Sequence, residues 1–522
     1  MRGNVGSLSR LVCYEMFGRK IVGGLTMNYI STRDNYSAVS AAKAVSLGMV
    51  PTGGLFVPEK LPDLSREEIM ARREDSYQET ACWVLNQFLQ DYSQVEIEEA
   101  VKAAYSPDKF PAREVTPIKE LDSKTYMLEL WHGPTAAFKD LALQLLPYLL
   151  VKARNKLAVD KDILILTATS GDTGKAALEG FKNVAGVKIV IFFPEEGVSR
   201  IQKRQMLSTE GENTEVVAVR GDFDDCQSAV KEVFADREFK NYIEEKGYQF
   251  SSANSINWGR LAPQIVYYFV AYHQLLKQES IKPGEGINVT VPTGNFGNIL
   301  AAYYARQLGL PVKKLLCASN ENKVLADFLQ TGIYDIEREL KQTISPSMDI
   351  LISSNLERFL FEVTGHDSSR INSWYDRLST TGQFEVDAAV LKQIQEIFAG
   401  YYAREKEVKV TIKEVYKNYD YLIDPHTAVA VKCLRKYRRE TADHAPAVVA
   451  STANPYKFPR AVLEGLQGEA VELNEFQIIE KLLELTGTSL HRNLQGLKTK
   501  EIKHGRKAER AEIKAEIKDI LS

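Results

Sequence analysis

Short apolar runs alternate with helical patterns from residue 111 to about residue 460, and this alternation constrains the fold more than any other feature of the chain. The runs lie at residues 163–168, 187–193, 216–219, 287–291, 315–318 and 447–450. Several of them are apolar at both alternating positions, as is typical of strands that helices cover on both faces. The pattern predicts parallel β-α-β architecture. In open sheets of this kind, ligands bind where the carboxyl ends of the strands meet the following turns.

The flanking regions differ from this pattern. Residues 27–105 are rich in turns and then in charged amphipathic helices, which predicts a separate small N-terminal domain. We expect the catalytic region at 106–470 and a helical, charged C-terminal segment at 471–522. Its apolar positions predict one face of a solvated surface helix and are Ile502, Ile513, Ile517 and Ile520. Residues 1–26 are expected to be a flexible or artefactual extension, with Met27 as the natural start.

Composition excludes several classes of function. With 66 basic against 69 acidic residues, the net charge of -3 gives no electrostatic case for binding nucleic acid or a membrane surface. No apolar run reaches the roughly 18 residues of a membrane span. The five cysteines are scattered and form no C-x-x-C pair, and the histidines show no H-E-x-x-H spacing, so neither a disulfide framework nor a metal site is predicted. A reducing cytoplasm fits best.

The segment at 131–140 carries the first chemical signal. Gly133 and Pro134 break structure, and a helix is predicted from Ala136 onward, which would put Lys139 in its first turn. Both the positive helix terminus and burial would favour the neutral amine that reacts with an aldehyde. A surface lysine at the start of a helix is the alternative reading.

Two glycine turns follow predicted strands, at 167–175 and 291–298. The backbone N–H groups of such turns can hold a carboxylate or a phosphate. Neither turn has the spacing of a Walker loop or the G-x-G-x-x-G order of a dinucleotide fingerprint. For the first turn, a tight strand-to-helix connection capped by Ser170 stays an alternative.

The residues Ser451 and Thr452 end the last apolar run and can offer a hydroxyl to a ring nitrogen. A lysine that reacts with an aldehyde, two anion-binding turns and a hydroxyl together match what a phosphorylated aldehyde cofactor needs.

At this point the chain resembles the threonine synthases, a family of the tryptophan-synthase-β-like (fold type II) pyridoxal-phosphate enzymes. The resemblance runs in family order from about residue 27 to 460. It is carried by Y-I-S-T-R (29–33), G-G-L-F-V-P (53–58), H-G-P-T-A-A-F-K-D (132–140), S-G-D-T-G (170–174), S-I-N-W-G-R (255–260), G-N-F-G-N (294–298), S-P-S-M-D (345–349), S-N-L-E-R (354–358), D-P-H-T-A (424–428) and S-T-A-N-P (451–455).

The resemblance implies two open, mostly parallel sheets flanked by helices, and pyridoxal 5'-phosphate as the cofactor. It implies that Lys139 is the Schiff-base residue and that Thr452 faces the pyridine nitrogen. The cofactor phosphate would lie against Gly294, Asn295, Phe296, Gly297 and Asn298. The substrate carboxylate would lie at Ser170, Gly171, Asp172 and Thr173. Many family members have histidine where this chain has Asn454.

The implied reaction converts O-phospho-L-homoserine and water to L-threonine and phosphate, the last step of threonine biosynthesis. The leaving phosphate needs cationic donors, for which Arg200, Lys203 and Arg260 are candidates, with ordinary surface salt bridges as the alternative. A phospho-lyase on the same scaffold and a non-catalytic protein that binds the cofactor or a metabolite are the competing functions. The chain is expected to act as a monomer or a homodimer on a small molecule.

Overall fold

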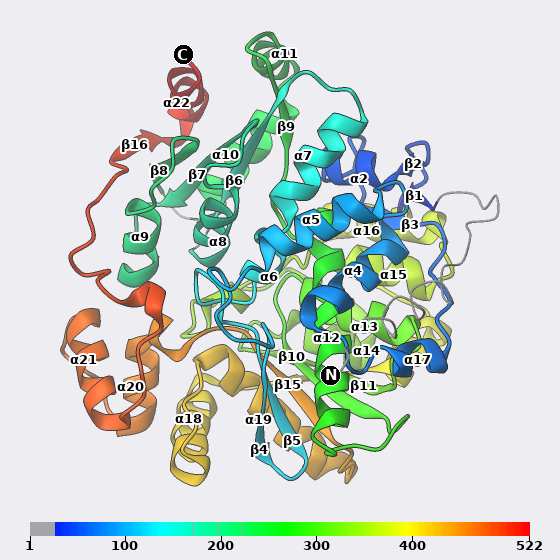
Figure 1. Cartoon of the computed structure of the whole chain (residues 1–522), viewed down its shortest axis with the longest axis vertical. Helices are drawn as coiled ribbons and strands as arrows, with labels where there is room; N and C mark the ends of the chain where they lie inside the picture. The colour runs from blue at the N-terminus through cyan, green and yellow to red at the C-terminus, as the bar shows by residue number, and fades with distance from the viewer. Residues whose placement is uncertain (1–26, 170, 197, 222) are drawn as a thin grey trace, which may run out of the picture.

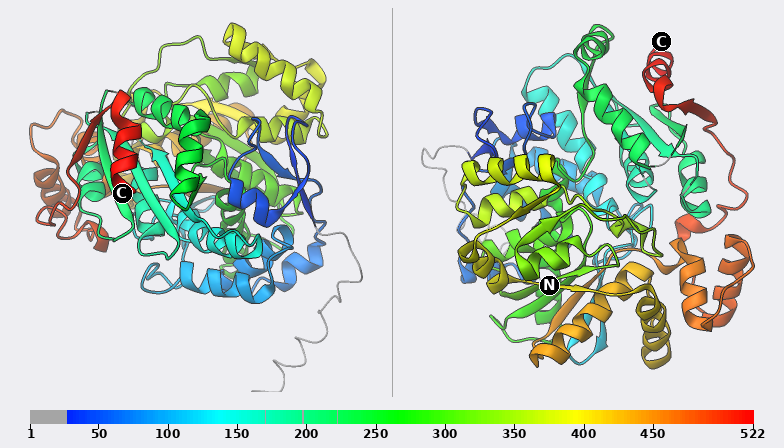
Figure 2. Two further views of the ribbon diagram at one scale, coloured as in Figure 1. Left: turned by 90° about the horizontal axis from the view of Figure 1, so that it is seen from above. Right: turned by 180° about the vertical axis from the view of Figure 1, so that it is seen from behind.

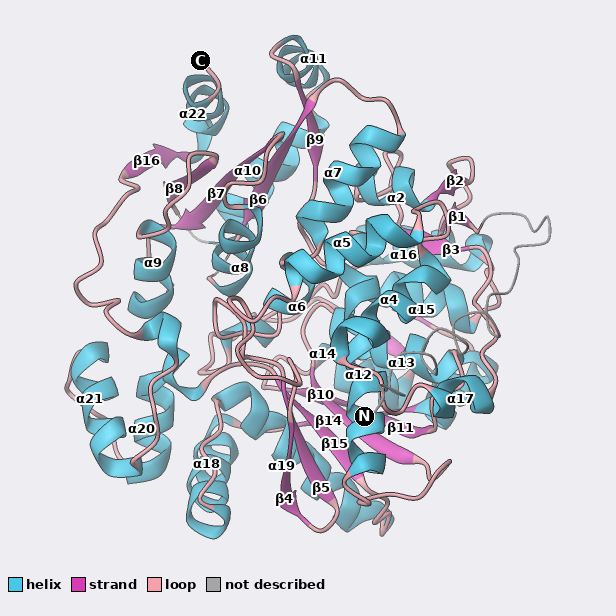
Figure 3. Cartoon of the chain, viewed as in Figure 1, coloured by secondary structure: helices cyan, strands magenta, loops and turns pink. Residues whose placement is uncertain are grey.

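The computed structural model describes residues 27–522 apart from residues 170, 197 and 222, so the predicted extension at 1–26 lies outside the described residues. Two open sheets lie at opposite ends of the molecule, and helices surround both of them (Figures 1 and 3). The predicted α/β fold with two mostly parallel sheets is therefore confirmed. In this described part of the chain, no helix combines the length and the apolar character that crossing a membrane requires.

The larger sheet has the strand order β14-β11-β10-β15-β5-β4. Its strands are parallel except for β4, which runs antiparallel to β5. The three runs predicted at 287–291, 315–318 and 447–450 form β10, β11 and β15 at its centre. The bounds are β4 (Ile118–Asp122), β5 (Thr125–Glu129), β10 (Ile287–Pro292), β11 (Val312–Ser319), β14 (Phe398–Tyr402) and β15 (Ala447–Ser451).

The smaller sheet is parallel throughout its described strands and has the order β16-β8-β7-β6-β9. Strands β6 and β7 are almost wholly buried, as their continuous apolar sequence predicts. The bounds are β6 (Asp162–Ala168), β7 (Val187–Pro194), β8 (Thr214–Arg220), β9 (Tyr248–Ser251) and β16 (Arg506–Glu509).

Helices cover both faces of the sheets, and the buried helix α12 (Trp258–Lys277) packs between several of them. The helices that follow the strands of the smaller sheet are α8 (Asp172–Phe181), α9 (Arg200–Leu207), α10 (Phe223–Ala235) and α11 (Arg237–Glu245). The other helices of this region are α6 (Asp140–Leu143), α7 (Leu146–Lys156), α13 (Gly297–Gln307), α14 (Val324–Thr331), α15 (Leu356–Val363), α16 (Ser368–Thr381), α17 (Ala388–Ile397), α18 (Glu405–Tyr419) and α19 (Pro425–Thr441). A small antiparallel pair, β12 (Ile333–Asp335) and β13 (Gln383–Glu385), packs beside α14 and α16.

The N-terminal region shares its core with the rest of the protein. The ring of Trp258, at the start of α12, makes edge contacts with Tyr29 and Phe88 at centroid distances of 5.4 and 5.5 Å. These residues belong to one continuous hydrophobic cluster. The elements of this region are the antiparallel sheet β2-β1-β3, formed by β1 (Asn28–Ser31), β2 (Val39–Ser40) and β3 (Phe56–Pro58), and the helices α2 (Ala41–Leu47), α3 (Arg66–Ala71), α4 (Tyr77–Phe88) and α5 (Gln94–Ala104).

The predicted C-terminal helix is present, with three of the four predicted isoleucines on its buried face, but Ile502 lies outside it and the segment also contributes a strand. After α20 (Pro459–Gln467) and α21 (Glu475–Thr486), the chain passes beside α9, and β16 then adds a parallel strand to β8 (Figures 1 and 2). The last helix, α22 (Ile513–Ile520), buries Ile513, Ile517 and Ile520 in the core of the smaller sheet, whereas Ile502 is exposed. The charged residues between these isoleucines form the outer face, so the tail completes a sheet.

Candidate active site

Lys139 lies after strand β5, at the residue that caps the N-terminus of α6. The sequence predicted that this helix begins at Ala136, but α6 begins at Asp140 because Ala136 has a φ of 58°, in the left-handed region. The loop before Lys139 is bonded to the segment after β15. The Phe138 N–H donates to the carbonyl oxygen of Thr452 over 2.9 Å. Strand pairing therefore brings two distant sequence motifs to the same place.

A close approach fixes the loop that leads to Lys139. The Asp140 carboxylate accepts hydrogen bonds of 2.7 Å from both the N–H and the hydroxyl of Thr135. A Cβ atom at Gly133 would lie 2.6 Å from the Cβ of Asp140, so only glycine fits there. Burial raises the pKa of Asp140 to about 6, and the two bonds from Thr135 act in the opposite direction.

The Lys139 side chain is largely enclosed, with 12% of its surface exposed, and its Nζ lies 3.9 Å from Asp172 Oδ2. Burial lowers the pKa of Lys139 to about 8. Asp172 opposes this shift, whereas the positive charges of Arg260 and Lys457 add to it. A useful fraction of this amine is therefore neutral near physiological pH, which a nucleophile or a general base requires.

Asp172 is held as an anion by a lysine that the sequence analysis did not single out. Lys457 is fully buried, and its Nζ lies 2.6 Å from Asp172 Oδ1 and donates to the Thr135 carbonyl oxygen over 2.8 Å. Gln202 donates to the same carboxylate oxygen over 2.7 Å. Burial alone would raise the pKa of Asp172, but Lys457 and Lys139 keep it well below its usual range.

The first glycine turn begins α8. The Thr169 hydroxyl oxygen accepts the N–H groups of Gly171 and Gly174 over 3.0 and 2.9 Å, so Thr169 takes the capping role that the bare-turn reading gave to Ser170. Ser170 itself lies outside the described residues. Asp172 and Thr173 form the first turn of α8, and Thr173 is partly exposed. The turn thus presents the positive end of a ten-residue helix to the neighbourhood of Lys139.

Arg260, in the first turn of α12, is 5% exposed, and its Nη1 donates to the Ala253 carbonyl oxygen over 2.7 Å. Among the described residues, no carboxylate lies within the 4.0 Å of a salt bridge to it. Burial lowers its pKa to about 10, which still leaves the guanidinium charged at neutral pH. A buried cation without a counter-ion is unfavourable unless an anion joins it. Arg260 is therefore suited to bind an anionic group.

The second glycine turn joins β10 to α13. Phe296 caps the helix in the left-handed conformation, with a φ of 59°. A Cβ at Gly294 would lie 2.6 Å from the Ser347 carbonyl oxygen, so this position also requires glycine. The N–H and the side-chain amide of Asn355 both donate to the Asn295 carbonyl oxygen, over 3.2 and 2.9 Å. These bonds hold the backbone of the turn in place. The first N–H groups of a helix have no partner within the helix, so those at the start of α13 are available to a ligand.

One orphaned atom supports a ligand at this turn. Asn298 Nδ2 is buried without a hydrogen-bond partner, while its Oδ1 accepts the hydroxyl of Tyr268. A buried amide donor without a partner is unfavourable, and a phosphate oxygen would satisfy it. The donors present, which are helix N-terminal amides and one side-chain amide, fit the phosphate of a cofactor.

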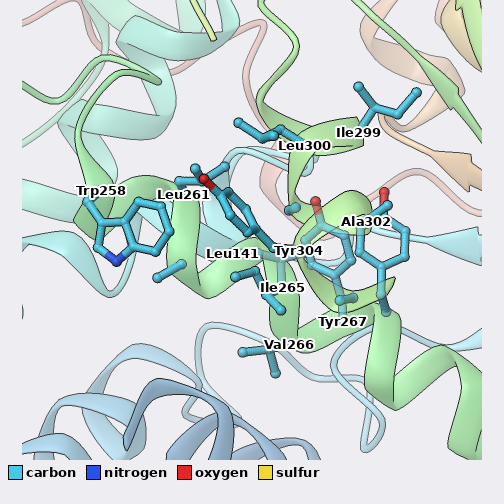
Figure 4. Packing of buried hydrophobic residues seen from close by; sticks show 14 of the residues in the cluster. Leu141, Trp258, Leu261, Ile265, Val266, Tyr267, Ile299, Leu300, Ala302 and Tyr304 are labelled. Carbon is cyan, nitrogen blue, oxygen red and sulfur yellow. The ribbon is translucent and has the colours of Figure 1, made fainter. Parts of the chain in front are cut away.

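Helix α12 connects the lysine to the second glycine turn. Leu141 of α6, Leu261 and Ile265 of α12, and Tyr304 of α13 lie in one buried cluster (Figure 4). One turn after Arg260, the Gln264 side chain lies 3.9 Å from the point that a Cβ at Gly297 would occupy. Helices α6 and α13, which begin next to Lys139 and at Gly297, therefore both pack on α12, which carries Arg260.

The residues after β15 complete this neighbourhood. Thr452 is 6% exposed, and its hydroxyl makes no hydrogen bond to the residues that the structure describes. Asn454 turns toward its own segment, where its side chain accepts the Tyr456 N–H over 3.1 Å. This residue, which departs from the family pattern, therefore acts as the cap of a short 3-10 turn.

The structure does not bring Arg200 and Lys203 together with Lys139. Both lie on the face of α9 opposite Gln202, which contacts Asp172. Lys203 donates to the Glu195 carbonyl oxygen over 2.9 Å, and Arg200 is exposed. Of the three predicted phosphate donors, only Arg260 lies in the site. Helical spacing puts residues 200 and 203 on one face and residue 202 on another, and the Gln202–Asp172 contact shows which face meets the site.

Three family models match the chain. They are threonine synthase N terminus over residues 28–105, pyridoxal-phosphate dependent enzyme over residues 110–453, and threonine synthase, C-terminal, over residues 427–515. Human threonine synthase-like 1 is 40% identical over 465 residues, which are 86% of this chain and 61% of that relative. The chain thus spans about three fifths of the length of threonine synthase-like 1.

Threonine synthase of Pseudomonas aeruginosa is 39% identical over 448 residues, which are 86% of this chain and 92% of that relative. The crystal structure of PLP-bound threonine synthase from Brucella melitensis matches with a TM-score of 0.84 and 36% identity over 95% of this chain and 99% of that chain. Yeast threonine synthase has the same TM-score at 32% identity, over 95% of this chain and 98% of that one. This chain therefore belongs to the threonine synthase family of pyridoxal-phosphate-dependent enzymes and has their type II fold.

Proposed function

We propose that this protein is a threonine synthase, which converts O-phospho-L-homoserine and water to L-threonine and phosphate in the last step of threonine biosynthesis. One observation carries the proposal. A buried lysine with a lowered pKa, Lys139, lies in the same enclosed cluster as Arg260, a buried arginine without an acidic partner among the described residues. Together they offer a proton acceptor and an anion site, as the removal of a phosphate from an amino acid requires.

The residues that would hold the cofactor are Lys139, the turn at 294–298 and Thr452. Lys139 would attach the cofactor through its neutral amine, and the amides at the start of α13 and Asn298 Nδ2 would bind its phosphate. The Thr452 hydroxyl would be the partner of the ring nitrogen. When bound, pyridoxal phosphate withdraws electrons from the substrate and so acidifies its α-carbon.

When it is not bonded to the cofactor, the Lys139 amine would serve as a mobile base. Its Nζ takes the proton from the substrate α-carbon and then the proton from the β-carbon. A pKa of about 8 lets this amine accept and return protons near neutral pH. The carboxylate of Asp172, 3.9 Å away, stabilises the ammonium that forms each time.

Arg260 receives the charge of the leaving group. The bond between the γ-carbon and its oxygen breaks, and the electron pair leaves with the phosphate, next to the guanidinium. The γ-carbon gains a proton and becomes the methyl group of threonine. The oxygen of water forms a bond to the β-carbon and becomes the hydroxyl.

The turn at 170–173 would bind the substrate carboxylate through the N–H groups at the start of α8. The Asp172 side chain has a different role, because Lys457 already neutralises it at 2.6 Å. We assign Asp172 and Lys457 as positioning residues for Lys139, while Gly171 and Thr173 contact the substrate.

Phospho-lyase activity on O-phospho-L-homoserine is the second candidate. Lys139 and Arg260 would serve the elimination of phosphate equally well in both reactions, and the two differ only in the fate of the β-carbon.

The test incubates the holoenzyme with O-phospho-L-homoserine and identifies the products by mass spectrometry. Equal amounts of L-threonine and phosphate are expected. Release of 2-oxobutanoate and ammonia would assign the phospho-lyase instead. If the protein took up the cofactor but released no phosphate, the reading as a non-catalytic binding protein would replace both enzymes.

We also propose a cytoplasmic location and a monomeric or homodimeric state. The location rests on the scattered cysteines, which suit a reducing compartment. Cell fractionation and the mass measured by light scattering test the two proposals. A secreted protein or a larger assembly would contradict them.

A further inference from the structure

A cavity of about 340 Å³ lies on the outer side of α9, away from the active site. It is formed where the C-terminal segment passes α9 (Figure 1). We call it the α9 cavity. It is lined by Arg200, Lys203, Arg204, Leu207, Asn474, Phe476, Lys498 and Ile502.

The charges in the α9 cavity have one sign. Its lining holds four cationic side chains and no acidic one. Arg200 is exposed and forms no salt bridge with the described residues. Lys203 and Arg204 donate to neutral carbonyl oxygens: Lys203 to Glu195 over 2.9 Å, and Arg204 to Leu497 and Lys500 over 2.6 and 2.8 Å. These bonds fix the side chains without neutralising them.

Only Lys498 has a carboxylate partner, Glu480, at 3.2 Å, and both side chains are about 60% exposed. Such an exposed pair is weak and is screened by solvent. Four cations close together in a concave site repel one another and raise the local concentration of anions. The cavity therefore lacks a counter-ion that matches its charge.

Part of the lining of the α9 cavity is apolar. It is made by Leu207, Phe476 and Ile502, and the Ile502 side chain is 43% exposed. A lining that combines cationic and apolar side chains suits a molecule with an anionic end and an apolar or aromatic body. The volume exceeds what an inorganic ion needs and matches the lower end of the range for small-molecule sites, about 300–1,000 Å³.

Helix ends do not account for the anion site. Asn474 caps α21, and its side chain already accepts the N–H groups of Phe476 and Gln477. Ser199 caps α9 in the same way by accepting the Gln202 N–H. Because these amides are taken, the attraction for an anion comes from the four side chains, and it can be removed by mutation.

We propose that the α9 cavity binds a small organic phosphomonoester, with its phosphate at Arg200, Lys203 and Lys498 and its apolar body against Phe476 and Ile502. Such a ligand would join α9 to the C-terminal segment. The inference does not depend on the proposed reaction, because none of these residues lies in the active site.

The test measures binding of adenosine 5'-monophosphate to the holoenzyme by calorimetry at low ionic strength, with adenosine and inorganic phosphate as comparisons. The nucleotide is expected to bind at least about 10-fold more tightly than adenosine or inorganic phosphate, and its affinity should fall as salt is added. Arg200→Glu should lower its affinity about 10-fold or more, because one attraction becomes a repulsion. An acidic residue at the start of a helix is favourable, so this variant should fold.

The matched control is Lys282→Glu, which makes the same charge change at an exposed position that does not line the cavity. It should leave nucleotide binding unchanged. A nucleotide that fails to bind the wild type, or that binds Arg200→Glu and the wild type equally, would overturn the site. Equal affinity for inorganic phosphate would overturn the organic class of ligand. Equal losses of nucleotide affinity in the two variants would also overturn the site, because they would show that binding depends only on the net charge of the protein.

Discussion

Replacing Lys457 by methionine would leave the Asp172 carboxylate buried without the ammonium that lies 2.6 Å from it. The Lys457 side chain is fully buried and that of Asp172 is 4% exposed, so water cannot replace the missing partner. Removing one member of a buried ion pair costs about 3–5 kcal/mol of stability. Lys139 and Gln202 still face Asp172, which places the expected loss near the lower end, at about 3 kcal/mol.

The same substitution should shift the titration of Lys139. In the native protein the Lys457 charge lowers the pKa of Lys139 and also neutralises part of the attraction of Asp172. Without Lys457, both effects raise the pKa of Lys139 above about 8. The neutral amine is then a smaller fraction at any given pH, so capture of the cofactor aldehyde by apo protein should need a higher pH.

Two measurements test this prediction. Equilibrium urea unfolding of the apo protein gives the loss of stability, and the absorbance of the bound cofactor, followed against pH, gives the midpoint of capture. The double variant Lys457→Met with Asp172→Asn removes both charges and should recover most of the lost stability. Lys175→Met breaks another buried pair, with Glu179 at 2.6 Å, and should lower stability without moving the midpoint. Unchanged stability in Lys457→Met, or a double variant no more stable than the single one, would refute the reasoning.

Four further predictions concern the site. Lys139→Ala should abolish turnover while the circular dichroism spectrum stays native. Because folding lowers the pKa of Lys139 from 10.5 to about 8, the stability of the wild type relative to this variant should increase as the pH rises through that interval. Curves of unfolding free energy against pH that run parallel for the two proteins would contradict this. Thr452→Asp should change the cofactor spectrum and the ratio of threonine to side products, which absorbance and chromatography measure. Arg260→Gln should raise KM about 10-fold or more while cofactor affinity stays constant, as one charged hydrogen bond is lost. Gly294→Ala, whose Cβ would lie 2.6 Å from the Ser347 carbonyl oxygen, should weaken cofactor binding in equilibrium dialysis.

Apolar runs predicted the centres of both sheets, because a strand covered on both faces must be apolar at every position. The run at 163–168 became β6 with a change of one residue at its start. The strands that were missed carry polar residues. In β5, Thr125 and Glu129 begin and end the strand, and in β16, Arg506 and Glu509 do so. Their place in a sheet depends on neighbours far away in the sequence, which no local pattern reveals.

The glycine turns and Lys139 could be found from the sequence because the turns directly follow apolar strands and the lysine lies at a predicted helix start. Lys457 could not, since nothing near it in the sequence distinguishes a buried lysine from an exposed one. Its role arises only when the segment after β15 pairs with the loop before α6 and brings Lys457 to Asp172. Family motifs marked the neighbouring residues 451–455 and ended two residues before it.

The buried cations near Lys139 affect both its pKa and the binding of anions, and the two effects are coupled. Arg260 and Lys457 both lower the pKa of Lys139, but only Lys457 has a carboxylate partner among the described residues. In the proposed reaction, the substrate phosphate would neutralise Arg260 and so remove its contribution. The Lys139 amine, which is partly neutral near physiological pH because its pKa is about 8, would then hold a proton more tightly once the phosphate is bound. Substrate binding would therefore strengthen the base at the stage where the α-carbon must lose its proton.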